Sequence, residues 1–112
     1  MYKRGEIVLI PVPFSDLSSS KKRPVVIMSC DEYNAKSDDV ICMAITSQIR
    51  GLEHEIIIGS DDMEEGLLPK ESCIRADKIY TLDQGIIAKK YGKLVKSKLE
   101  IAVLSIERLI SV

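Results

Sequence analysis

The chain has 112 residues and a mass of 12.5 kDa, the size of one ordinary domain, which excludes two independent cores. Hydrophobic residues make up 46% and charged residues 29%, a composition typical of folded chains and unlike that of disordered ones. A formal net charge of -1 excludes the strongly basic balance of a general nucleic-acid coat, and one Phe, four Tyr and no Trp argue against an aromatic base-stacking platform. We therefore expect residues 1–112 to form a single domain.

The N-terminal third predicts two strands joined by a loop. Glu6–Phe14 is apolar and β-branched, with prolines at its far end, where a strand tolerates the loss of a ladder donor. Ser15–Lys22 is small, polar and charged, which is typical of a loop. Arg23–Ser29 then predicts a second strand with a proline near its start. This order places Arg23 at the edge of the loop.

Three consecutive basic residues stand at this edge, Lys21, Lys22 and Arg23. Charge is unevenly distributed along the chain, with a net +3 in residues 1–30, -8 in residues 31–83 and +4 in residues 84–112. The basic cluster is a candidate local anion site. The alternative interpretation is an ordinary solvated loop.

The middle of the chain alternates short apolar runs with polar turns. Asp31–Lys36 predicts a helical turn, and the apolar run Asp39–Ile45 predicts a central strand that Thr46–Gln48 closes. His54–Gly59 predicts a further strand, which the acidic turn Ser60–Gly66 follows.

The segment Ser72–Tyr80 alternates as a strand does. Because side chains of a strand point to opposite faces in turn, the alternation predicts two sets of residues. One face carries Arg75, Asp77 and Ile79, and the other carries Ile74, Ala76 and Lys78.

The C-terminal segment changes to a helical period. Its apolar residues follow one stripe of an amphipathic helix: Leu99, Ala102, Val103, Ile106, Leu109 and Ile110. Ser97–Glu100 matches a capping box and marks one start for this helix, and Lys93–Lys96 could add a preceding turn. Many short strands followed by one helix indicate a mainly β (α+β) fold, a small, strongly bent β-barrel plugged or flanked by the helix.

The sequence offers little for a disulfide, a metal or a membrane. Cys30, Cys42 and Cys73 are odd in number and lie in or beside apolar runs, which indicates buried thiols in a reducing compartment. No Cys-x-x-Cys pair occurs and His54 is the single histidine, so we expect no metal site. No apolar stretch approaches the roughly 20 residues that cross a bilayer, so we expect no membrane partner and a cytoplasmic location.

Four segments in order resemble one family. They are Arg4–Pro11 with Pro13–Leu17, then Lys22–Ile27, then Ala44–Ser47, then Ser72–Asp83. Together with the chain length and the terminal helix, they resemble the MazF/PemK toxins, in particular a PemK-like subgroup. The resemblance implies an SH3-like barrel of the CcdB/MazF/PemK type that forms a homodimer and is neutralised by an antitoxin. It also implies a type II toxin that cleaves single-stranded RNA without a metal or other cofactor, and so inhibits translation and growth.

Metal-free RNA cleavage sets chemical requirements that candidate residues can be compared with. The adjacent 2′-OH attacks phosphorus and leaves a 2′,3′-cyclic phosphate and a 5′-OH. The protein must accept one proton, donate another and stabilise the charge that develops on the phosphate. Arginine offers planar, fixed donors to phosphate oxygens, so Arg23 and Arg75 are candidate clamps.

The resemblance also implies roles for individual residues. The arginine of the Arg-Pro pair and the threonine of the Thr-Ser pair correspond to Arg23 and Thr46, and the family's Arg-x-Asp acid and base correspond to Arg75 and Asp77. Asp77 would be the base. The adjacent Arg75 lowers the pKa of Asp77, however, and burial would have to offset this; the alternative is a structural ion pair.

Weaker candidates surround these four. The residues Lys21, Lys22, Ser47 and Gln48 are candidate contacts to RNA phosphates or bases, although an exposed loop and strand end would look the same. His54 lies outside the matched segments and is interpreted as a surface strand residue.

Two alternative functions remain open. One is a non-enzymatic toxin of the same fold that inhibits a protein target such as DNA gyrase, although such toxins lack the Arg-Pro and Thr-Ser pairs. The other is a degenerate module that binds RNA or an antitoxin without cleaving.

Overall fold

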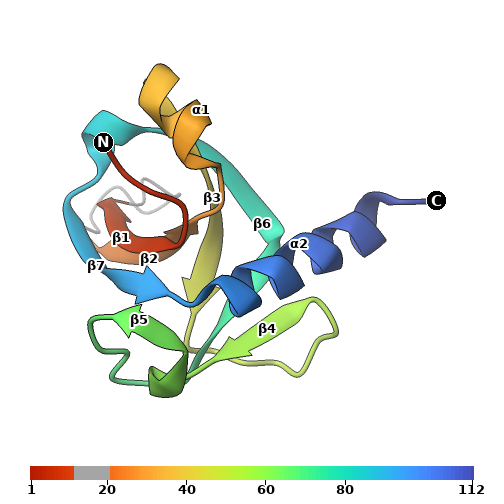
Figure 1. Ribbon diagram of the computed structural model, residues 1–112. Helices are drawn as coiled ribbons and strands as arrows, with labels where there is room; N and C mark the ends of the chain where they lie inside the picture. Colours follow the sequence, from red (N-terminus) through yellow and green to blue (C-terminus); the bar gives the residue numbers. More distant parts are fainter. Residues whose placement is uncertain (12–20) are drawn as a thin grey trace.

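The computed structural model describes residues 1–11 and 21–112. The end of the predicted first strand and most of the predicted first loop, residues 12–20, lie outside the described residues. The described chain is mostly β, with a curled antiparallel sheet and a long C-terminal helix (Figure 1).

Seven strands form one sheet in the order β4-β6-β3-β2-β1-β7-β5, and all the described pairings are antiparallel. The strands are β1 Glu6–Pro11, β2 Lys22–Ile27, β3 Asp39–Thr46, β4 Glu55–Ile58, β5 Met63–Glu65, β6 Ser72–Asp83 and β7 Lys89–Leu94. The edge strands β4 and β5 are separated by residues 59–62 alone, so the sheet must curl to bring its edges together (Figure 1). This curl produces the barrel-like shape that the strand pattern predicts.

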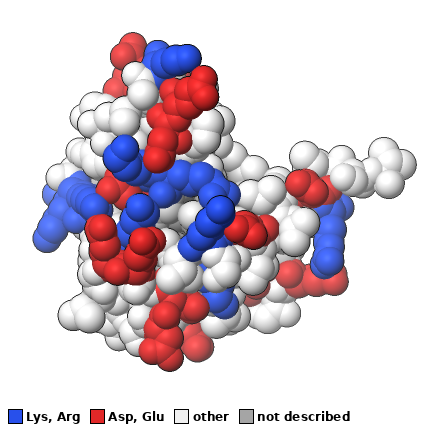
Figure 2. Space-filling model, in the orientation of Figure 1, with Lys and Arg blue, Asp and Glu red and all other residues white. Residues whose placement is uncertain are grey.

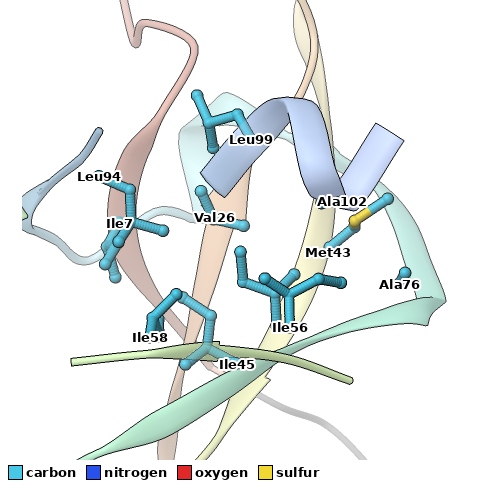
Figure 3. Packing of buried hydrophobic residues seen from close by; sticks show 11 residues of the cluster. Ile7, Val26, Met43, Ile45, Ile56, Ile58, Ala76, Leu94, Leu99 and Ala102 are labelled. Carbon is cyan, nitrogen blue, oxygen red and sulfur yellow. The ribbon is translucent and has the colours of Figure 1, made fainter. Parts of the chain in front are cut away.

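Both faces of the central strands are buried. In β1, Ile7 belongs to one apolar cluster, and Val8 and Ile10 belong to a second cluster on the other face. The first and larger cluster lies between the sheet and the C-terminal helix, α2 Lys96–Ile110, which contributes Leu99 and Ala102 (Figure 3). The sheet therefore has a helix-covered core on one side and a smaller core on the other.

The short helix α1 spans Asp31–Lys36, as the sequence predicts. The predicted central strand is also confirmed, and β3 extends it by one residue to Thr46. Two strands were missed by the sequence analysis. The acidic segment contains the 3-10 turn Ser60–Asp62 and then β5, and the polar segment Lys89–Leu94 forms β7.

Gly92 explains why such a polar segment can lie beside β5. A Cβ at this position would lie 2.6 Å from the backbone oxygen of Glu65 and 2.6 Å from Met63 Cε. Only glycine therefore allows β7 to approach β5 this closely.

The helix α2 begins before the predicted capping box, at the end of the segment Lys93–Lys96 that the sequence left open as a preceding turn. It starts at Lys96 with Val95 as its N-cap and without a side-chain cap hydrogen bond, so the predicted capping box at Ser97–Glu100 is wrong. The apolar stripe is covered from Leu99, which is buried, to Ile106, which is half-buried against the same core cluster. Leu109 and Ile110 are exposed because the end of the helix extends away from the sheet (Figure 1).

The pairing of β3 with β6 is interrupted by a bulge. Met43 pairs with Ile79, whereas the next residue, Ala44, pairs with Arg75. Residues 76–78 are therefore extra residues on β6, and simple alternation fails there. Lys78, which the alternation places with Ile74 and Ala76, is exposed, whereas Ile74 and Ala76 are buried in the core.

The surface carries charges of both signs (Figure 2), and Cys42 and Cys73 are buried. Acidic and basic side chains are interspersed over the face seen in Figure 2. Cys42 and Cys73 are buried as expected, and burial raises the pKa of the Cys42 thiol to about 12. Cys30 is exposed, contrary to expectation. Among the described residues, none of the helices is long and apolar enough to cross a membrane.

Candidate functional site

A hollow of about 870 Å³ opens on the face of the second, smaller core. Strands β1, β2, β3 and β6 and the segment after β3 supply its walls. Its polar lining residues are Arg23, Thr46, Ser47, Gln48, Arg50, Ser72, Arg75, Lys78 and Tyr80. Four of these are cations, and within the described part of the chain the lining includes neither Asp nor Glu. The hollow is therefore a positively charged recess over an apolar floor.

Arg23 and Thr46 reach the hollow from neighbouring strands. Arg23 lies near the start of β2, opposite Ile10 of β1, and its side chain is exposed. Thr46 is the last residue of β3, and its Oγ1 accepts a hydrogen bond from the backbone amide of Gln48 at 3.1 Å. That bond turns the chain so that Ser47 and Gln48 also line the hollow, and it leaves the hydroxyl proton of Thr46 able to donate.

Arg75 enters the hollow from β6 and is held by Asp77. Arg75 Nε donates to Asp77 Oδ1 at 2.9 Å and Nη2 donates to Oδ2 at 2.7 Å, a bidentate ion pair. The side chain of Arg75 is only 10% exposed, whereas that of Asp77 is 32% exposed. The hydrogen bonds from Arg75 hold the pKa of Asp77 below its ordinary value, and those to Asp77 raise the pKa of Arg75. Asp77 itself is not among the lining residues.

A buried carboxylate, Glu55 of β4, supports the segment that follows Thr46. Glu55 Oε1 accepts hydrogen bonds from the backbone amides of Arg50 and Leu52, each at 3.0 Å. Burial acts to raise the pKa of Glu55, but these amides and the charge of Arg75 lower it overall. Gly51, with φ of +76°, provides the left-handed residue of this turn. The carboxylate thus fixes the loop that carries Arg50.

The structure brings together most of the residues that the sequence singled out. Arg23, Thr46 and Arg75 line one hollow. So do the weaker candidates Ser47 and Gln48, whereas Lys21 and Lys22 are exposed outside its lining.

Four polar lining residues were not singled out from the sequence, namely Arg50, Ser72, Lys78 and Tyr80. Lys78 reaches the hollow because of the bulge in β6, which a single sequence does not reveal. Arg50 depends on the loop geometry that Glu55 sets. In the sequence, the one sign that Arg50 belongs to the hollow was that it is a basic residue close to the Thr46–Ser47 pair.

The arrangement suits a phosphate group better than a metal ion. Guanidinium groups supply fixed, planar donors, and a hydroxyl beside them can donate to a phosphate oxygen or to a ribose hydroxyl. Among residues 1–11 and 21–112, no three His, Cys, Asp or Glu side chains are grouped so as to hold a metal ion. The chemistry available at the hollow is thus the binding of an anion and the stabilisation of charge on it.

Comparisons with solved structures show the same fold at low sequence identity. An endoribonuclease in complex with its cognate antitoxin from Mycobacterial species superimposes with a TM-score of 0.81 and 17% identity, covering 100% of this chain and 97% of that chain. MazF from Deinococcus radiodurans gives a TM-score of 0.79 at 18% identity, covering 99% and 97%. The Mycobacterium tuberculosis toxin MazF-mt6 gives 0.74 at 20% identity, covering 92% and 93%.

The family itself is established from the sequence over nearly its whole length. No curated protein matches this chain. The family model described as PemK-like, MazF-like toxin of type II toxin-antitoxin system matches residues 3–110. The fold class predicted from the strand order is confirmed by the solved MazF structures. The chain therefore belongs to the PemK-like, MazF-like toxin family of type II toxin-antitoxin systems.

Proposed function

We propose that this toxin is a metal-independent endoribonuclease that cleaves single-stranded RNA, including mRNA, to 2′,3′-cyclic phosphate and 5′-OH ends. One observation carries the proposal: Arg23, Thr46 and Arg75, which come from three different strands, line one cationic hollow with no acidic lining residue in the described part of the chain. Such a recess attracts a phosphodiester and holds it by fixed donors.

In this proposal Arg23 and Arg75 contact the non-bridging oxygens of the scissile phosphate. Their contribution grows as negative charge develops on the phosphate during attack by the 2′-OH. Thr46 donates its hydroxyl proton to a phosphate oxygen or orients the 2′-OH. Ser47, Gln48, Arg50 and Lys78 contact the flanking nucleotides, and Lys21 and Lys22 add positive charge beside the hollow.

Asp77 has a different role in the proposal from the one that the sequence resemblance implies. A free carboxylate would be the base, but both oxygens of Asp77 accept hydrogen bonds from Arg75, and the lowered pKa of Asp77 makes it a weak base. Asp77 thus acts through Arg75, whose guanidinium it holds toward the hollow.

The partners in this proposal follow from the family. The active form is a homodimer in the cytoplasm, built from one toxin domain over residues 1–112. A cognate antitoxin, expected to be small, acidic and partly disordered, binds across the basic recess. Solved structures of related MazF proteins include complexes of MazE with MazF from Deinococcus radiodurans.

The proposal is tested by incubating the purified protein with a long single-stranded RNA in excess EDTA. We expect discrete cuts whose products carry a 2′,3′-cyclic phosphate and a 5′-OH. RNA binding without such products would favour the degenerate binding module instead. Inhibition of DNA gyrase by a protein that neither binds nor cuts RNA would favour the non-enzymatic toxin.

A further inference from the structure

The single histidine of the chain contacts Asp77 of the Arg75–Asp77 pair from the turn before β4. His54 directly precedes β4, and its Nε2 atom lies 3.3 Å from Asp77 Oδ2. The same Oδ2 accepts the 2.7 Å hydrogen bond from Arg75 Nη2. The backbone also ties His54 to the bulge, because Ala76 N donates to His54 O at 3.3 Å. His54, Asp77 and Arg75 therefore form a continuous row that ends in the hollow.

The environment of His54 Nε2 determines where the imidazole proton must lie. This atom is enclosed by the protein and makes no well-aligned hydrogen bond with any described residue. If Nε2 carried no proton, its buried lone pair would face a carboxylate oxygen at 3.3 Å, which is unfavourable. If Nε2 carries a proton, a small reorientation gives a hydrogen bond to Asp77. The position of Nε2 beside a carboxylate oxygen therefore favours a donor there.

Charge on the neighbouring groups explains why such a donor is useful. The guanidinium of Arg75 is buried and paired with Asp77 on its own strand, and Glu55, its pairing partner on β4, adds a second negative charge nearby. Asp77 lies on a bulge and is about a third exposed, so a second donor beside Arg75 adds to the restraint on its orientation. A second donor at His54 fixes the plane of the carboxylate.

We propose that His54 is a positioning residue of the phosphate site: its Nε2–H fixes Asp77, and Asp77 fixes the guanidinium plane of Arg75 in the hollow. This inference rests on the proposed ribonuclease function, in which Arg75 is one of the two arginines that contact the scissile phosphate. It assigns no proton transfer to His54 itself.

The tautomer of His54 is tested directly in the intact protein by NMR with 15N-labelled histidine. Because the chain has one histidine, its ring signals need no assignment. We expect Nε2 to carry a proton at neutral pH and its resonance to shift in Asp77→Asn. A neutral ring protonated only at Nδ1 would overturn the proposal.

Kinetics test whether His54 acts through Asp77. In His54→Gln the side-chain amide can still donate to Asp77, so kcat/KM should stay within about threefold of the original value. In His54→Leu no donor remains, and we expect kcat/KM to fall about tenfold, mainly in kcat, because Arg75 contributes most when charge develops.

The double variant separates positioning from a general structural role. If His54 acts through Asp77, the leucine substitution should reduce kcat/KM by less than twofold when it is made in Asp77→Asn. A full additional tenfold loss in that background would overturn the proposal. So would equal losses in His54→Gln and His54→Leu.

A measurement that does not depend on RNA cleavage distinguishes failure of the ribonuclease proposal from failure of the proposed role of His54. If the original protein cuts no RNA, the side-chain Nε–H signal of Arg75 becomes the readout of guanidinium position. It should move in His54→Leu and remain in place in His54→Gln. An Arg75 signal that is the same in both variants would overturn the inference independently of any cleavage.

Discussion

Replacing Asp77 by asparagine removes one negative charge while leaving the shape of the side chain almost unchanged. The wild-type carboxylate accepts two hydrogen bonds from Arg75, at 2.9 and 2.7 Å. The asparagine keeps one acceptor oxygen and presents an NH₂ group where the second acceptor was. The positive charge of Arg75, whose side chain is only 10% exposed, therefore loses the negative charge and one of the two acceptors that Asp77 supplied.

The expected loss of stability in Asp77→Asn depends on how deeply the Arg75–Asp77 ion pair is buried. Hydrogen bonds to charged groups stabilise proteins by about 1.5–3 kcal/mol when they are buried, and by less where solvent screens them. Because Asp77 is 32% exposed, we expect Asp77→Asn to lower the free energy of unfolding by about 1–2 kcal/mol at neutral pH.

The difference in stability between the wild type and Asp77→Asn must decrease as the pH falls. The pKa of Asp77 is lower in the folded protein than its ordinary value, mainly because of the hydrogen bonds from Arg75. Such a group stabilises the folded state above the unfolded pKa of about 3.9, and the stabilisation is lost as the pH falls through the lower folded value. The difference between wild type and variant should therefore be full at pH 7 and shrink below about pH 4.

Urea denaturation followed by circular dichroism at pH 7 and pH 3 measures this difference. Glu32→Gln is a matched control, since it makes the same change in the exposed pair of Glu32 with Lys36 and should leave stability unchanged. A difference for Asp77→Asn that is the same at both pH values, or absent at pH 7, would refute the ion-pair reasoning.

Three further predictions concern the hollow, the sheet and the thiols. Thr46→Val should slow RNA cleavage about 10–100-fold and Thr46→Ser should largely preserve it, because the hydroxyl is the group that acts; equal initial rates for both variants would exclude that role. Gly92→Ala should destabilise the fold by about 1–3 kcal/mol in urea titrations, since its Cβ would lie 2.6 Å from the oxygen of Glu65; an unchanged midpoint would contradict this close contact. Ellman's reagent should label Cys30 in the native protein and reach Cys42 and Cys73 only on unfolding, whereas rapid labelling of all three would show that the core opens.

The central strands could be predicted because their sequence pattern is local. The apolar run at Asp39–Ile45 and the short helix at Asp31–Lys36 contain all the information needed to identify them. The polar segment Lys89–Leu94 does not, because it becomes a strand only through its place between β1 and β5. Tertiary pairing thus overrides local propensity there.

The C-terminal helix α2 shows a second limit of prediction from a local sequence pattern. Its apolar period predicts the helix correctly, but the period cannot tell which part of the stripe will be covered. Leu99 is packed into the core, whereas Ile110 at the far end of the same stripe is exposed. The start at Lys96, without a side-chain cap, shows that packing against the sheet determines the boundary more than the capping residues do.

The residues at the candidate site also fall into two groups, those in a local sequence motif and those placed by the pairing of distant strands. Arg23, Thr46 and Arg75, which line the hollow, were predicted as site residues because each lies in a short motif. Lys78, which lines the hollow, and His54, which contacts Asp77, were not predicted, because the bulge in β6 and the pairing of β4 with β6 place them. Residues that depend on the register of distant strands leave no signal in one sequence.

The most direct test of the central claim compares initial rates of RNA cleavage in EDTA for the original protein, Arg23→Ala and Lys36→Ala. Both variants remove one exposed positive charge, but only Arg23 lines the hollow. We expect Arg23→Ala to lose cleavage while its circular dichroism spectrum is unchanged, and Lys36→Ala to cleave at the original rate. Equal rates for all three folded proteins, or no cleavage by any of them, would contradict the assignment of this hollow as the ribonuclease site.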